Sequence, residues 1–209
     1  MSALEKIASA QGRNDEVPNQ ELAKKLAAKK DHLGIAEIAA NLWNENSQIQ
    51  SDCLKVLYEI GYLQPELIAP YADDFLKLLH SRHTRLVWGA MIALATVADL
   101  KAEAIYPYVE EIKRVMDLGS VIAKDNGVQV LALVAAQNAA YRKEIFPYLL
   151  HQLETCRPKD VPQYAEKTAV AVNTRNQQQF VGVLEKRLVD LSGVQVARVK
   201  KVIQEAEQH

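Results

Sequence analysis

The chain has 209 residues, of which 49% are hydrophobic and 24% are charged, so it is long enough to bury a hydrophobic core. This composition excludes a disordered or fibrous protein. Its 25 Lys and Arg nearly balance its 26 Asp and Glu, which gives a formal charge of −1. Because binding to a phosphate backbone usually requires an excess of positive charge, nucleic acid is not an expected partner.

The cysteines and the hydropathy pattern favour a cytoplasmic protein. Cys53 and Cys156 are too few to staple a small secreted scaffold. Residues 1–10 include Glu5 and Lys6 and lack the apolar core of a signal peptide. The longest apolar stretch, 86–98, has 13 residues, and a membrane helix needs about 20. We expect a cytoplasmic chain with no membrane contact.

Apolar residues at helical spacing, separated by short Pro, Gly or polar segments, predict an all-α chain. We expect residues 1–18 to be a partly mobile N-terminal lead and residues 19–31 to form a capping helix. Two kinds of helix then alternate within a single repeat domain at 19–209. The first helices are predicted at 34–45, 65–80, 103–117, 142–155 and 177–190, and the second helices at 48–61, 84–98, 125–139, 162–174 and 194–207.

Three of the first helices share a Pro-Tyr opening. Pro70-Tyr71, Pro107-Tyr108 and Pro147-Tyr148 follow one another at spacings of 37 and 40 residues. Proline is tolerated in a first helical turn because the N–H that it lacks has no helical partner there. The acidic pairs Asp73-Asp74 and Glu110-Glu111 favour the positive end of the helix dipole. We interpret these pairs as helix starts and not as catalytic carboxylates.

The second helices carry apolar residues at i, i+3, i+4 and i+7, the core stripe of an amphipathic helix. The first positions of successive stripes are separated by 37, 42, 36 and 31 residues: Cys53, Ala90, Ala132, Thr168 and Val199. A helical hairpin of this length cannot bury its stripe alone and must stack on its neighbours. The pattern therefore predicts a repeat protein.

Around these stripes the chain resembles the HEAT-repeat family of armadillo-like α-solenoids, including small prokaryotic-type members. Ile49, Leu86 and Val128 match the family's aliphatic position, four residues before a small stripe residue. The family's usual arginine is replaced by Gln50, Val87 and Gln129. The resemblance covers about residues 33–207. It implies a right-handed α-α superhelix of about five helical hairpins plus an N-terminal capping helix, with the second helices on the concave side.

Positions opposite the core stripe are expected to be exposed, because they point away from it at 100° per residue. In the middle repeats these positions carry an apolar row: Trp88, Ile92, Val130, Val134 and Val170. Tyr58 and Arg85 belong to a more polar rim. We expect this surface to bind a protein or peptide partner, with Trp88 as the anchor, or a second copy of the chain. Alternatively, neighbouring helices or residues 1–18 cover the row.

The sequence contains no glycine-rich phosphate loop, nucleophile elbow or metalloprotease motif, so no catalytic residue, cofactor or metal site is expected. His80 and His83 could share a metal, but no Cys or acidic residue adjoins them, and we interpret them as part of a basic turn. Cys156 precedes two cations that could activate a thiol, yet no histidine follows closely. Cys53 belongs to a core stripe and should be inert.

A function from a different class remains as the alternative. HEAT-like bacterial alkylpurine DNA glycosylases use a concave cleft with aromatic and acidic residues. Trp88 with Asp52 and Asp125 could form a similar cleft, although no motif match carries those residues over. The balanced charge disfavours this nucleic-acid-binding alternative. A non-enzymatic interaction or scaffold module is therefore the favoured function.

Overall fold

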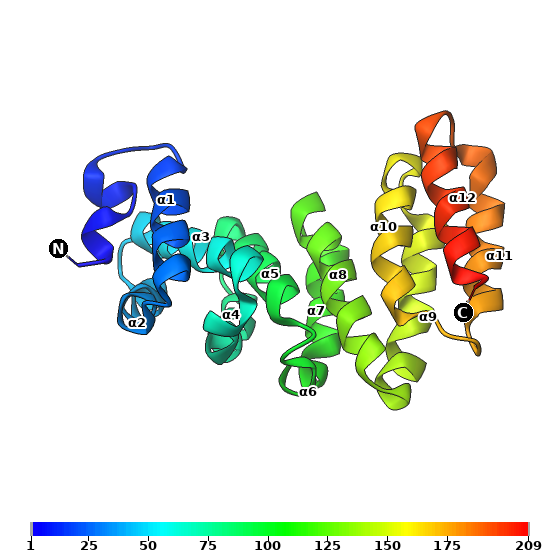
Figure 1. Ribbon diagram of the computed structural model, residues 1–209, viewed down its shortest axis with the longest axis horizontal. Helices are drawn as coiled ribbons and strands as arrows, with labels where there is room; N and C mark the ends of the chain where they lie inside the picture. The colour runs from blue at the N-terminus through cyan, green and yellow to red at the C-terminus, as the bar shows by residue number, and fades with distance from the viewer. Residues whose placement is uncertain (1, 209) are drawn as a thin grey trace. The chain divides into compact units, whose positions relative to one another are not determined.

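A computed structural model describes residues 2–208, and all of the regular structure in this range is helical. This confirms the predicted all-α class. The chain divides into two compact units, an N-terminal unit that ends at Gly127 and a C-terminal unit that begins at Val128. Each unit consists of packed helices (Figure 1). The single domain predicted at 19–209 remains a prediction.

The N-terminal unit is built around α3 and α5. α3 packs against α1, α2 and α5, and α5 also packs against α4. The side chain of Asp31 caps α2, and that of Asn46 caps α3. The helices of this unit are α1 (Val17–Lys29), α2 (His32–Ala40), α3 (Ser47–Leu63), α4 (Ala72–Leu78), α5 (Thr84–Val97), α6 (Ala102–Ile105) and α7 (Val109–Leu118), and α8 (Val121–Gln137) crosses the division point.

The core of this unit comes from the stripes that helical periodicity predicts. In α3 the stripe residues Cys53, Val56, Leu57 and Ile60 are fully buried, and so are Ala90, Ala93, Leu94 and Val97 in α5. Burial of each large aliphatic side chain contributes about 1.5–3 kcal/mol. The predicted stripes therefore form the interior of the N-terminal unit.

The lead predicted at 1–18 is ordered over residues 2–16, which pack against α1, α2 and α3, and its last two residues begin α1. Ile7 is fully buried. The backbone N–H of Ala8 donates to Asn19 Oδ1 at 2.9 Å, and that of Ser9 donates to Asp52 Oδ2 at 2.8 Å. Asn19 Nδ2 donates to the other oxygen of Asp52 at 2.7 Å. Asp52 and Asn19 thus tether this segment to the first helices, while its mobility in solution remains a prediction.

The C-terminal unit contains four further helices. α9 packs against α10 and α11, and α12 packs against α10 and α11. Leu149, Leu153, Phe180, Leu184 and Val199 are fully buried between them. Their bounds are α9 (Ala139–Thr155), α10 (Val161–Thr168), α11 (Gln177–Arg187) and α12 (Val194–Ala206).

The Pro-Tyr pairs begin helices in only two of the three predicted cases. Pro70 and Pro107 lie in 3-10 turns that lead directly into α4 and α7. Pro147 instead lies inside α9, which begins at Ala139. The start of α9 is determined by Asn138, whose side-chain oxygen accepts a hydrogen bond from Tyr141 N at 2.9 Å. A good N-cap upstream therefore overrides the proline signal.

Candidate partner-binding site

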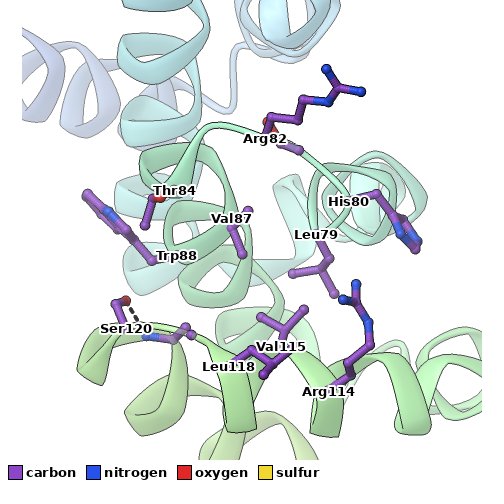
Figure 2. A pocket seen from close by; sticks show the side chains of 13 residues that line it. Leu79, His80, Arg82, Thr84, Val87, Trp88, Arg114, Val115, Leu118 and Ser120 are labelled. Carbon is purple, nitrogen blue, oxygen red and sulfur yellow. Dashed lines mark hydrogen bonds between the residues drawn. The ribbon is translucent and has the colours of Figure 1, made fainter.

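A pocket of about 360 Å³ lies beside Trp88 in the N-terminal unit. Its walls come from the turn between α4 and α5 and from the turn between α7 and α8. Figure 2 shows Trp88 at one end of the pocket and His80 and Arg114 at the other. Apolar side chains lie between these ends: Leu79, Val87, Val115 and Leu118. We call this feature the Trp88 pocket.

The turn between α7 and α8 depends on Gly119. A Cβ atom at this position would lie 2.2 Å from the carbonyl oxygen of Val115, so only glycine fits without a shift of the backbone. Ser120 then caps the start of α8, because its Oγ accepts a hydrogen bond from Ala123 N at 3.3 Å (Figure 2). This tight turn leaves Leu118, the last residue of α7, 78% exposed beside the pocket.

The charged end of the Trp88 pocket is organised by Glu111. Its carboxylate accepts hydrogen bonds from Arg114 Nε at 2.9 Å and Arg114 Nη2 at 2.5 Å, and it lies 3.3 Å from His80 Nδ1. The Arg114 hydrogen bonds lower the pKa of Glu111 against the opposing effect of burial, and the charge of His80 lowers it further. The charge of Arg114 is therefore balanced within the protein.

Arg82 differs from Arg114, because no carboxylate among the described residues forms a salt bridge with it. Its side chain extends from the turn between α4 and α5, away from the apolar side chains of the pocket (Figure 2). An unbalanced cation at the edge of a pocket that also presents apolar side chains favours a partner with a nearby acidic side chain. The pocket itself offers noncovalent binding of an apolar group.

The expected exposed row is wrong for three of its five residues. Ile92 is only 8% exposed, and Val130 and Val134 are fully buried. α5 packs against both α3 and α4, so more than one of its faces is covered. α8 carries apolar residues around most of its circumference, which is typical of a buried helix and gives its stripe no unique direction. The alternative of a covered row is therefore correct for these residues.

The remaining predicted residues are placed as follows. Trp88 is half-buried, and Val170 is 47% exposed in the C-terminal unit. Arg85 is exposed, and its guanidinium lies 3.5 Å from Glu16. Tyr58 was expected in the rim, but it is only 5% exposed and its ring packs under the Lys55 ammonium at 4.8 Å. Only Trp88 among them lines the Trp88 pocket.

Cys53, Cys156 and Asp52, which were considered as candidates for chemistry, have surroundings that favour a structural role. Burial raises the pKa of Cys53 to about 12, with further contributions from Asp52 and Glu37. Burial also raises the pKa of Cys156, although Arg187 opposes it. Both thiols are thus poor nucleophiles near neutral pH. Both oxygens of Asp52 accept hydrogen bonds, from Ser9 and Asn19.

Residues 2–208 contain no group of three or more His, Cys, Asp and Glu side chains arranged to hold a metal ion. Within the same range, no helix combines the length and apolar character needed to cross a membrane.

Three aspects of the Trp88 pocket were not predicted from the sequence. The approach of His80 to Glu111 joins residues that are 31 positions apart, and no local pattern links them. Leu118 was not singled out because it ends a helix outside the core stripes. The role of Gly119 had a visible signal, since a glycine followed by serine between two apolar segments favours a turn and a helix start.

No protein-family model and no curated protein sequence matches the chain. Solved structures with the same fold do match. An engineered protein is 20% identical, with a TM-score of 0.70 over 100% of this chain and 98% of that one. A designed armadillo repeat protein in complex with the peptide (KR)4 is 16% identical, with a TM-score of 0.70 over 90% and 86% of the two chains.

A third similar structure belongs to computationally designed armadillo repeat proteins for modular peptide recognition. It is 16% identical, and the match has a TM-score of 0.65 and covers 98% of each chain. At such identities the likeness concerns the fold. Together with the alternating helices and their buried stripes, it confirms the predicted solenoid class: the chain has the all-α fold of armadillo-like helical-repeat proteins.

Proposed function

We propose that this protein is a non-enzymatic interaction module that binds a segment of a partner protein in the Trp88 pocket. The observation that carries the proposal is the group of apolar side chains between Trp88 and Leu118, which lines a pocket open to a ligand. Covering one large apolar side chain contributes about 1.5–3 kcal/mol. A partner that places an apolar side chain here gains that contribution.

The fold supports the proposal by analogy. The designed armadillo repeat proteins with this fold are described as binding the peptide (KR)4 and as made for modular peptide recognition. Helical repeats present side chains from successive hairpins along an extended surface, which suits a peptide or a helix. The fold thus favours a peptide or a helix as the kind of partner, and the Trp88 pocket supplies the specific contact.

The proposed surface is smaller than the row expected from the sequence. Ile92, Val130 and Val134 are buried and contribute no contact area. Trp88 remains the anchor, and Arg85 remains a proposed contact beside it because it is exposed. Val170, which is exposed in the C-terminal unit, remains a proposed contact of that unit alone. The preferred segment has a large apolar side chain for the pocket and an acidic side chain near Arg82.

The test is affinity capture of partners from a native cell lysate by three proteins, the wild type, Trp88→Ala and Trp43→Ala. Trp43 is the matched control, because it is the other tryptophan, is 49% exposed and lies outside the pocket. A partner lost only with Trp88→Ala supports the proposal. Equal loss with both variants, or retention by both, contradicts it. Sedimentation of the same three proteins without lysate identifies self-association, in which case the partner is a second copy of the chain.

We further propose a cytoplasmic location and the absence of enzymatic activity. Free Cys53 and Cys156 suit a reducing compartment. The hydrogen bonds of Asp52 to residues 9 and 19 favour a structural role over a glycosylase role. Titration with duplex DNA at low and moderate salt tests the nucleic-acid alternative, because tight, salt-sensitive binding would support it.

A further inference from the structure

The C-terminal unit contains a second pocket, of about 520 Å³, which sequence analysis did not identify. This volume is typical of ligand-binding sites. The pocket lies between the first turns of α9 and the segment that leads into α11. Three cations and three amides contribute to its lining: Arg142, Lys143, Arg175, Asn173, Asn176 and Gln179. We call it the basic pocket.

No carboxylate in the described part of the chain balances the positive charge of the basic pocket. No carboxylate lines it. Among residues 2–208, none of its three cations takes part in a salt bridge, whereas four other cations of the C-terminal unit have a carboxylate within 3.6 Å: Arg157, Arg187, Arg198 and Lys201. Three cations gathered without an anion repel one another, and an anionic ligand would relieve that repulsion.

Arg142 is held in place before any ligand arrives. Its Nε donates to the carbonyl oxygen of Ala171 at 2.9 Å, and its Nη2 donates to that of Ala136 at 3.0 Å. Asn176, which is 9% exposed, donates to the same Ala171 oxygen at 3.0 Å. A guanidinium has five N–H donors, so donors remain for a ligand. A side chain that is already ordered loses little entropy on binding.

The charge of the whole unit agrees with this local excess. Residues 128–209 carry 11 Lys and Arg against 8 Asp and Glu, a net charge of +3, whereas residues 1–127 carry 14 against 18, a net charge of −4. The near-neutral total therefore conceals a positive C-terminal unit. A long-range field of this sign attracts acidic ligands to the unit that contains the basic pocket.

We propose that the basic pocket binds an acidic peptide segment, in which a carboxylate side chain is flanked by apolar ones. Arginine pairs with a carboxylate through two parallel hydrogen bonds, and the exposed Ala139, Ala140 and Pro147 offer apolar contacts beside the cations. The only aromatic ring in the lining, Phe146, is buried and presents no face for a nucleic-acid base to stack on. This inference does not depend on the Trp88 pocket.

The test measures fluorescence anisotropy of a labelled peptide of repeated Leu-Glu-Glu, with a Leu-Gln-Gln peptide as the uncharged probe. Lys143→Gln combined with Arg175→Gln should weaken binding of the Glu peptide by about tenfold, because two charge-assisted contacts are lost. Lys186→Gln combined with Lys200→Gln removes the same charge from exposed positions of the same unit, outside the pocket. This control should weaken binding by less than about twofold.

Several results would overturn the proposal. They are an absence of binding of the Glu peptide to the wild type at millimolar concentration, equal binding of the Gln peptide, and equal loss in the two double variants. Tighter binding of single-stranded DNA than of the peptide, lost in Lys143→Gln with Arg175→Gln, would assign the pocket to nucleic acid instead. Trp88→Ala should bind the Glu peptide normally, so this test and that of the proposed function fail independently. Both substituted side chains are exposed, and circular dichroism verifies that the variants fold.

Discussion

Replacement of Val134 by alanine tests the burial of the predicted apolar row. The side chain of Val134 is fully buried in α8, whereas that of Val170, another member of the same row, is 47% exposed. Val→Ala removes two methyl groups, each worth about 0.8 kcal/mol of transfer free energy, and leaves a cavity whose cost adds to this. We expect Val134→Ala to lower the free energy of unfolding by about 2–3 kcal/mol. Val170→Ala should lower it by less than about 1 kcal/mol.

The assay is urea unfolding followed by circular dichroism at 222 nm, with the two variants and the wild type measured side by side. A shift of the midpoint without a change of slope reports a change in stability alone. Equal and small effects of the two substitutions would refute the reasoning, because Val134 would then be as accessible as Val170. Val134→Lys sharpens the contrast, since a lysine ammonium at a fully buried position costs several kcal/mol and should prevent stable folding.

Three further predictions concern the pocket turn, the thiols and an ion pair. In thermal unfolding, Gly119→Ala should destabilise the protein by about 1–3 kcal/mol, because the added Cβ would collide with the Val115 carbonyl oxygen. A Cβ added at Gly182, inside α11, has no atom within 4 Å, so Gly182→Ala should stabilise the protein by up to about 1 kcal/mol. Destabilisation by both substitutions would contradict this prediction. When a thiol reagent is added at pH 8 and labelling is followed by mass spectrometry, Cys53 should react only as fast as the protein unfolds, since burial raises its pKa to about 12. Labelling of the folded protein as fast as that of the protein unfolded in urea would show that the thiol is accessible. Hydrogen bonds from Arg198 lower the pKa of Glu166, so this pair stabilises the protein at pH values above the unfolded-state pKa, and the stabilisation is lost as the pH falls through the folded-state pKa. Arg198→Met should therefore lower the free energy of unfolding by about 0.5–1 kcal/mol at pH 7 and by progressively less below about pH 4.3, as measured by urea titrations. A loss of stability that does not depend on pH would exclude this mechanism.

The helices could be predicted from the sequence because their signals are local. The segment predicted at 84–98 is α5 at Thr84–Val97, and the one predicted at 194–207 is α12 at Val194–Ala206. Apolar residues at period 3.6 and the breaks between them suffice for this. The buried stripe of α3 was equally predictable, but the burial of Lys55 and Tyr58 on the other side of the same helix was not.

The exposed surface could not be predicted in the same way. In α8, apolar residues surround the helix, so the four-residue stripe that contains Ala132 did not reveal that Val130 and Val134 are also buried. The two pockets arise where turns from different hairpins meet. The contact of His80 with Glu111 and that of Arg142 with Ala171 join residues about 30 positions apart, and such pairs depend on how the hairpins stack. The periodicity of apolar residues along the chain contains no information about which residues of different hairpins come into contact.

The opposite charges of the two units have a consequence for how the protein behaves in a test tube. Residues 1–127 and 128–209 carry net charges of −4 and +3, so separate molecules can attract one another through unlike parts even though the whole chain is close to neutral. Such attraction extends about 30 Å at 0.01 M ionic strength and only about 8 Å at 0.15 M. Added salt should therefore raise the solubility of this protein. Reversible clustering at low salt can be distinguished from specific, apolar binding in the Trp88 pocket because only the clustering should weaken strongly as the ionic strength rises.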